Sequence, residues 1–215
     1  MNFENQFQPN SDNFEGQEDF EKNRIGILQQ SGIEVGEKLD LALLILKRKD
    51  AAFLGNADII ESEDHEKQLA KKFQEEFFGI EEVLKQTSLL YDATPPHNDR
   101  GVYCFSILAS GSGEGLKKAI EAQKNQDDKA LGFLFGYPKT AVEAYNTDKK
   151  FDYDLYLPKE ELDELKNEGV LPFLGFMPSR EHWKEELNWA KENQSLIKEK
   201  APLIYEELVL DNPKD

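Results

Sequence analysis

The stretch Val102-Tyr-Cys-Phe-Ser-Ile-Leu-Ala-Ser-Gly-Ser-Gly-Glu-Gly115 decides the fold class of this 215-residue chain. Its first part, Val102 to Ala109, is rich in β-branched and aromatic residues, which predicts a strand. The glycines after it predict a turn, and Leu116, Ala119 and Ile120 then recur on one face of a helix. The stretch is therefore interpreted as a strand–turn–helix unit.

Two more units of this kind are predicted farther along the chain. Leu131 to Phe135 predicts a strand, followed by Gly-Tyr-Pro and a helix near Lys139 to Tyr145. Val170 to Phe176 predicts another strand, followed by Met-Pro-Ser and a long helix to about Glu199. A short β-like run, Thr87 to Tyr91, is expected to pair antiparallel with the first strand across a proline-containing turn.

The last two units also match each other at a separation of 40 residues. Leu131, Phe133, Leu134 and Pro138 recur as the set Leu171, Phe173, Leu174 and Pro178. The match is open to two interpretations, a duplication or the same local solution used twice, and two copies do not make a solenoid.

The alternation of strands and helices predicts an α/β fold with parallel neighbours in its sheet. We expect one domain over residues 25–215, with a mixed, partly parallel sheet of about four to six strands flanked by helices. Residues 1–24 are rich in Asn, Gln, Glu and Asp and predict a disordered acidic tail, although its phenylalanines leave docking on a partner or on the domain open. Further helices are predicted at Leu39–Leu46, at Glu63–Phe78 between an N-cap at Ser62 and a stop at Gly79, between Pro158 and Gly169, and after Pro202.

The charge and the cysteine content exclude several classes of protein. There are 43 acidic and 26 basic residues, giving a net charge of −17, which would repel nucleic acids and anionic lipids. No apolar run reaches the roughly 18 residues that a membrane helix needs. The N-terminus does not resemble a signal peptide, and Cys104 is the one cysteine. We therefore expect a cytoplasmic protein with no nucleic-acid or membrane partner.

The starts of the predicted helices form the candidate ligand site. Because the turns after parallel strands emerge at one sheet edge, groups at those turns are expected to converge. A small anionic ligand, such as a metabolite or nucleotide, would meet hydroxyls, cations and the positive ends of helices there. Gly111 and its neighbours match neither the dinucleotide nor the phosphate-loop motif, so a plain connection is the alternative interpretation. The candidate ligand-binding residues are Ser110, Ser112, Lys139, Thr140, Ser179 and Arg180.

The histidines and the cysteine do not predict catalysis. His65, His97 and His182 lack the spacing of a zinc site, and one cysteine cannot complete it. Cys104 and His97 flank one predicted turn, so a nucleophile and its base are conceivable, but a cysteine in an apolar strand is usually inert. We assign no catalytic residue, no metal ligand and no cofactor.

The segment Leu131-Gly-Phe-Leu-Phe-Gly-Tyr-Pro-Lys-Thr-Ala-Val-Glu-Ala-Tyr145 resembles a family of uncharacterised small bacterial proteins. Members carry an apolar strand that ends in Gly-Tyr-Pro and is followed by a short helix. Lys49–Phe53 and Phe173–Asn193 are loosely similar to the same family, whereas residues 1–24 and 152–168 depart from it. The resemblance implies a fold and no activity.

These observations favour a non-enzymatic protein that acts by binding a protein partner or a second copy of itself. The alternative is a small-molecule binding protein or an enzyme that uses the turns near Gly111, Lys139 and Arg180.

Overall fold

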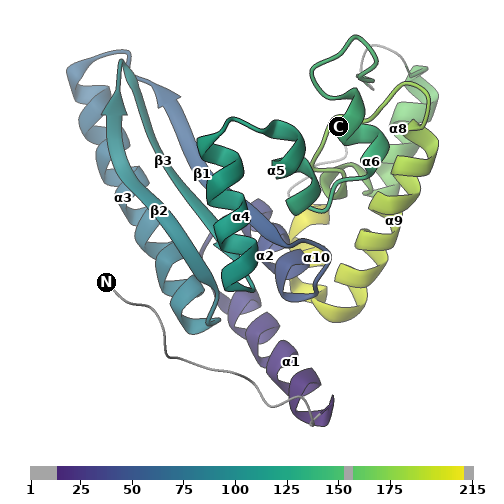
Figure 1. Cartoon of the computed structure of the whole chain (residues 1–215), viewed down its shortest axis with the longest axis horizontal. Coiled ribbons are helices and arrows are strands. Elements are labelled where there is room, and N and C mark those ends of the chain that lie inside the picture. The colour runs from purple at the N-terminus through teal and green to yellow at the C-terminus, as the bar shows by residue number, and fades with distance from the viewer. Residues whose placement is uncertain (1–13, 153–156, 211–215) are drawn as a thin grey trace.

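The computed structural model describes residues 14–152 and 157–210 (Figure 1). It combines helices with one small sheet. The helices are α1 (Phe14–Gln30), α2 (Val35–Ile45), α3 (Glu63–Gln86), α4 (Gly113–Lys124), α5 (Asp128–Leu134), α6 (Lys139–Ala144), α8 (Lys159–Glu168), the 3₁₀ turn η1 (Leu171–Phe173), α9 (Trp183–Lys200) and α10 (Pro202–Leu210). The strands are β1 (Ala51–Ile59), β2 (Leu90–Asp99) and β3 (Val102–Ser110).

The sheet corrects the predicted fold class. It has three strands in the order β1-β3-β2, and both pairs are antiparallel, so the partly parallel sheet of about four to six strands is wrong. The β2–β3 pair is antiparallel as predicted, but β2 continues through Pro95 and Pro96 to a tight turn at Arg100 and Gly101. Prolines are tolerated there because β2 is an edge strand.

The two predicted strands in the C-terminal half are helical turns. Leu131–Phe135 lies in α5 and its C-cap, and Leu171–Phe173 forms η1. The first run contains no β-branched residue, and the Asp127 side chain caps α5 by accepting the amide of Ala130 at 3.0 Å. The predicted parallel pairs required these two strands, so they do not form in the described part of the chain.

The similarity between the two runs nevertheless has a structural counterpart. Each run is a short helical turn that ends at a glycine with positive φ, Gly136 at 73° and Gly175 at 59°. A proline follows each glycine, two residues on at Pro138 and three residues on at Pro178. The two segments therefore share one local structure, a helical turn closed by a glycine and followed by a proline, and it is helical where a strand was predicted.

The sheet is covered on both faces by helices. Phe105, Ile107 and Ala109 point to one face, where α3 packs and where Phe73 meets Phe105 edge-on at 5.6 Å. Leu108, on the other face, packs with Ala119 of α4. This alternation follows from the period of two in a strand. Ser62 caps α3 as predicted, but the helix continues past Gly79.

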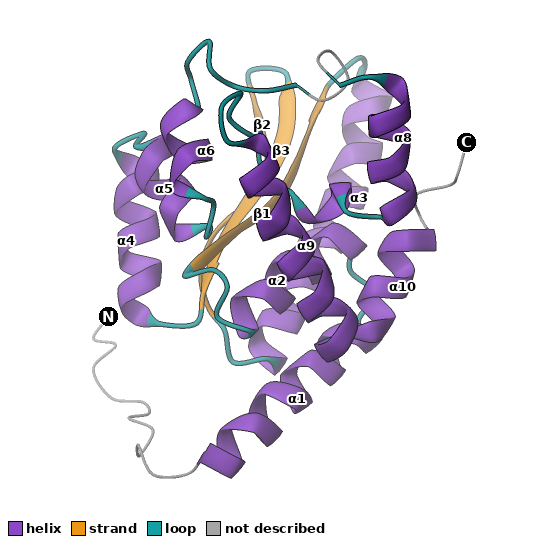
Figure 2. Ribbon diagram, turned by 90° about the vertical axis from the view of Figure 1, so that its right-hand side faces the viewer, coloured by secondary structure: helices purple, strands orange, loops and turns teal. Residues whose placement is uncertain are grey.

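The remaining helices pack beside this sheet. Figure 2 shows α4, α5 and α6 grouped on one side of the strands, α9 in front of them and α10 on the side opposite α4, and contacts join α2, α9 and α10 to one another. The core between these last three helices is apolar, with Leu41, Ile197 and Ile204 inaccessible to solvent. An ion pair of 2.8 Å between Lys38 and Glu207 joins α2 to α10.

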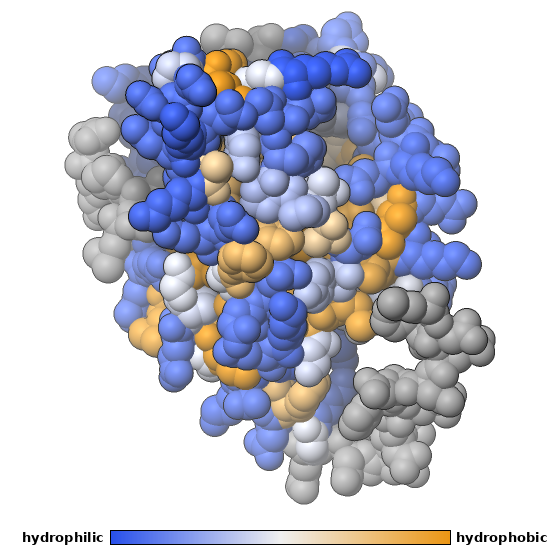
Figure 3. Space-filling model, turned by 90° about the vertical axis from the view of Figure 1, so that its left-hand side faces the viewer, coloured by the Kyte–Doolittle hydropathy of each residue, from blue (hydrophilic) through white to orange (hydrophobic). Residues whose placement is uncertain are grey.

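Of the segment predicted to be a disordered tail, residues 1–13 lie outside the described residues, and Phe14–Arg24 form the first part of α1. The side of the molecule on which α3 lies carries mostly hydrophilic side chains (Figure 3). Among the described residues, no helix combines the length and the apolar character needed to cross a membrane.

Candidate functional site

A cavity of about 280 Å³, here called the aromatic pocket, lies between α5, α6 and the loop 175–177. Its walls are mostly apolar, and the carboxylate of Asp128 is the only charged side chain that the described part of the chain contributes to them. The aromatic pocket is lined by Asp128, Leu131, Gly132, Phe135, Tyr137, Ala141, Val142, Tyr145, Gly175, Phe176 and Met177.

The first two walls depend on glycines in and after α5. A Cβ on Gly132 would come within 2.9 Å of Val142, so α5 and α6 can approach this closely only because Gly132 has no side chain. Gly136 has a φ of 73°, and a Cβ there would lie 2.2 Å from the carbonyl oxygen of Arg48. The amide of Asp50 also donates to Leu134 at 2.8 Å. The end of α5 is thus fixed against the start of β1.

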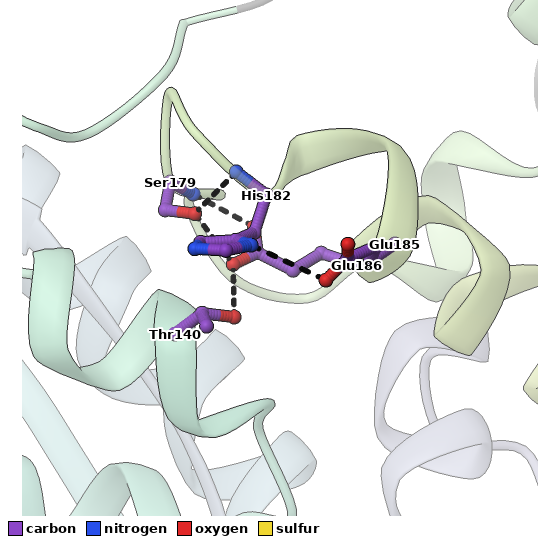
Figure 4. Close-up of polar contacts among 5 residues, drawn as sticks. All are labelled: Thr140, Ser179, His182, Glu185 and Glu186. Atoms are coloured by element: carbon purple, nitrogen blue, oxygen red, sulfur yellow. Dashed lines mark hydrogen bonds and ion pairs between the residues drawn. The ribbon is translucent and has the colours of Figure 1, made fainter.

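The third wall is held by a buried carboxylate (Figure 4). Glu186 of α9 is 1% exposed and accepts the hydroxyl of Thr140 at 2.6 Å. It also accepts the amide of Ser179 at 2.7 Å and the Ser179 hydroxyl at 2.8 Å. Because Thr140 is next to a lining residue of α6 and Ser179 follows the loop 175–177, this group, the Glu186 latch, joins two walls of the pocket.

Tyr137 is the central aromatic side chain of the pocket. Its ring meets Phe176 at 5.3 Å and Phe135 at 6.0 Å between centroids. Burial raises the pKa of Tyr137 to about 12, and the charge of Asp40 adds to this effect. Its hydroxyl is therefore protonated at neutral pH and can donate a hydrogen bond. Lys49, which forms an ion pair with Asp40, places its Nζ 5.8 Å from the centroid of the same ring.

The structure brings two of the six predicted ligand residues together. Thr140 and Ser179 share the carboxylate of Glu186, so the predicted helix-start hydroxyls do bind an anionic group, which belongs to the protein itself. Ser110 is bonded elsewhere, to the carbonyl of Asp50 at 2.6 Å, and Ser112 caps α4.

The two predicted cations are also engaged locally. Lys139 lies 3.6 Å from Glu143 on its own helix. The amide of Arg180 donates to the carbonyl of Lys149, and its Nε donates to the carbonyl of Lys150. Neither cation lines the aromatic pocket.

Cys104 and His97 face each other across β2 and β3. Their Sγ and Nε2 atoms are 3.9 Å apart, and the carbonyl of Pro95 lies 3.0 Å from Nδ1 of His97. Cys104 is half-buried rather than in the core, which differs from the expectation for an apolar strand. Within the described ranges, no cluster of three or more His, Cys, Asp or Glu side chains is arranged to hold a metal ion.

Sequence reasoning missed the pocket because five of its lining residues, Leu131, Gly132, Phe135, Gly175 and Phe176, come from runs that were interpreted as strands. Glu186 was indistinguishable from the many other acidic residues of a chain with 43 of them. One signal was available: the two similar runs, 131–138 and 171–178, both contribute to the pocket. Comparisons of the chain with models of known protein families, with curated proteins and with solved structures found no match.

Proposed function

We propose that this protein acts by binding, and that the aromatic pocket holds a small molecule. The observation that carries the proposal is the pocket itself, about 280 Å³ with apolar and aromatic walls and few polar groups. Ligand sites have this composition, and they typically start at about 300 Å³, so a small ligand is favoured.

The side chains around the pocket favour binding over catalysis. The phenol of Tyr137 is not a general base at neutral pH, because burial raises its pKa to about 12, even farther from neutrality than that of an ordinary tyrosine. Thr140 and Ser179 already donate to Glu186, which makes their hydroxyls part of the scaffold. The same bonds weaken the case for an anionic ligand at these helix starts.

A fragment screen by ligand-observed NMR tests this proposal. Tyr145 lines the pocket and is 48% exposed, whereas Phe133 on neighbouring α5 is 49% exposed and does not line it. We expect fragments to bind the parent and the Phe133→Ala variant equally and to lose affinity for Tyr145→Ala. Binding that is unaffected by Tyr145→Ala, or no binding by any fragment, would contradict the proposal.

A protein partner or self-association is the second candidate, and β1 favours it. Phe53 and Ile59 lie on the same face of this edge strand and are 45% and 69% exposed. Pairing through the strand edge itself is disfavoured, because the side chains of Asn56 and Asp58 accept the amides of Ala57 and Ile59. A partner would therefore contact the side-chain face.

Light scattering after size-exclusion chromatography tests self-association. We expect a dimer in the parent and a monomer when Phe53 and Ile59 are both replaced by serine. A parent that stays monomeric at high concentration would exclude self-association, and capture of a defined partner that the double variant loses would then be required.

A further inference from the structure

We propose that the aromatic pocket selects a small organic cation, an ammonium or quaternary ammonium compound. This inference rests on the proposed function and adds the chemical class of the ligand. It follows from the charge of the lining residues, from the arrangement of the rings and from the net charge of the chain.

The charge inside the pocket is negative. Among the residues that the structure describes, Asp128 is the one charged residue of the lining, and none of the others there is a lysine or an arginine. The neutral amide of Asn146 donates to Asp128 at 2.9 Å, which leaves the negative charge of this carboxylate in place. Lys139, the cation in the first turn of α6, turns to Glu143. An anion in the pocket would face Asp128, and the charge of nearby Lys49 is already offset by Asp40, whereas a cation would be attracted.

Three aromatic rings of the lining contact one another in a row. Tyr137 and Phe176 are inclined to each other by 42°, and Phe135 and Tyr137 by 70°. Tyr145 and the polarizable sulfur of Met177 complete the lining near the surface. The face of an aromatic ring attracts a cation through its quadrupole, and aromatic side chains are the usual lining of sites for quaternary ammonium ligands.

The chain offers internal support for this chemistry. The ring of Tyr137 already interacts with the ammonium group of Lys49, whose charge is offset by Asp40. The net charge of −17 also raises the local concentration of cations around the whole molecule. The volume of about 280 Å³ is enough for an ammonium group with a short organic body.

A matched pair of probes separates charge from shape. Choline and 3,3-dimethyl-1-butanol have the same branched head, but only choline is charged. We expect isothermal titration calorimetry to give choline an affinity about tenfold higher, since cation–π contacts and one carboxylate supply this difference. Equal affinities, or tighter binding of the alcohol, would overturn the cation inference and leave the pocket as a binding site for neutral molecules.

Two sets of variants assign the preference to the pocket. Asp128→Asn should weaken choline binding about fivefold, whereas Asp64→Asn, in the first turn of α3, should not change it. Tyr145→Leu should weaken choline binding but not alcohol binding, and Tyr145→Phe should restore it. A choline affinity unaffected by both Asp128→Asn and Tyr145→Leu would overturn the inference. If neither probe binds, the cation inference fails, and the fragment screen decides separately whether the pocket binds anything.

Discussion

The sheet region (residues 35–124) and the pocket region (residues 128–152 and 157–200) hold their helices and strands in place by different means. In the sheet region, β3 is paired with both neighbours over its length, and Ser62 and Ser112 cap the helices that cover it. In the pocket region, short helices are positioned by single contacts from distant residues, such as those of Gly136 and Glu186. The pocket region should therefore be more sensitive to individual substitutions.

Replacing two glycines with positive φ, one in each region, should give the largest difference in stability. Gly136→Ala should destabilise the protein by about 4 kcal/mol, because it adds backbone strain and a clash with Arg48. Gly101→Ala in the β2–β3 turn has a similar strain but open space around it, so about 1 kcal/mol is expected. Urea unfolding of both variants measures the difference. Equal losses would break the contrast between the two regions.

Removing the carboxylate of the Glu186 latch should give the next largest loss of stability. Glu186→Ala leaves the buried hydroxyl and amide donors of Thr140 and Ser179 without an acceptor, so we expect a loss of about 3 kcal/mol in the free energy of unfolding. Glu185→Ala, one residue away and exposed, should change it by less than about 0.5 kcal/mol. If the two variants unfold at the same urea concentration, the latch does not hold the pocket region together.

Glu37, a half-buried carboxylate in the sheet region, should make the stability of the protein depend on pH. Burial, and then the charge of Glu76, raises the pKa of Glu37 from 4.5 to about 7. Between these values the unfolded chain releases the proton that the folded protein keeps. Stability therefore falls as pH rises from 4.5 to about 7 and does not fall further from this group.

Glu37→Gln should remove this loss. We expect the variant to be about 2 kcal/mol more stable than the parent at pH 8, after allowance for solvent screening, and equally stable at pH 4. Glu34→Gln, on an exposed neighbour, serves as the control. A Glu37→Gln variant with the same pH dependence as the parent would show that Glu37 titrates normally.

The smallest effect is expected at a local cap. Ser112→Ala removes the hydroxyl that accepts a hydrogen bond from the amide of Gly115 at the start of α4. The free energy of unfolding of the protein should therefore fall by about 1 kcal/mol. Ser195→Ala, on the exposed side of α9, should have almost no effect. A loss at Ser112 as large as that at Glu186 would mean that local and distant contacts matter equally in this fold.

Much of the fold could be predicted where the sequence signal was local. The helices with clear caps or periodicity, such as α2, α4 and α9, were confirmed, and so was the antiparallel pair of β2 and β3. The errors fell on short apolar runs, for which strand and buried helix have the same composition. Leu131–Phe135 lacks β-branched residues, and Pro172 suits the start of a helical turn, so both features favoured helix over strand.

The candidate site was less accessible to sequence reasoning. Thr140 and Ser179 were predicted to take part in binding a small anionic ligand, and nothing in their spacing indicates that both bond to Glu186 instead. The pocket depends on which helices lie side by side. Their neighbours were predicted from a partly parallel sheet that the protein does not have. The role of the remaining candidate residues in ligand binding stays a prediction.

The latch also determines when, during synthesis, the pocket can exist. Chains are made from the N-terminus, and domains acquire structure as their residues emerge. The walls from α5 and α6 are available early, but their connection to the loop 175–177 requires Glu186 of α9. A ribosome-bound chain that stops short of α9 should therefore carry α5 and α6 without the closed pocket, so ligand binding would report that α9 has been made and has packed.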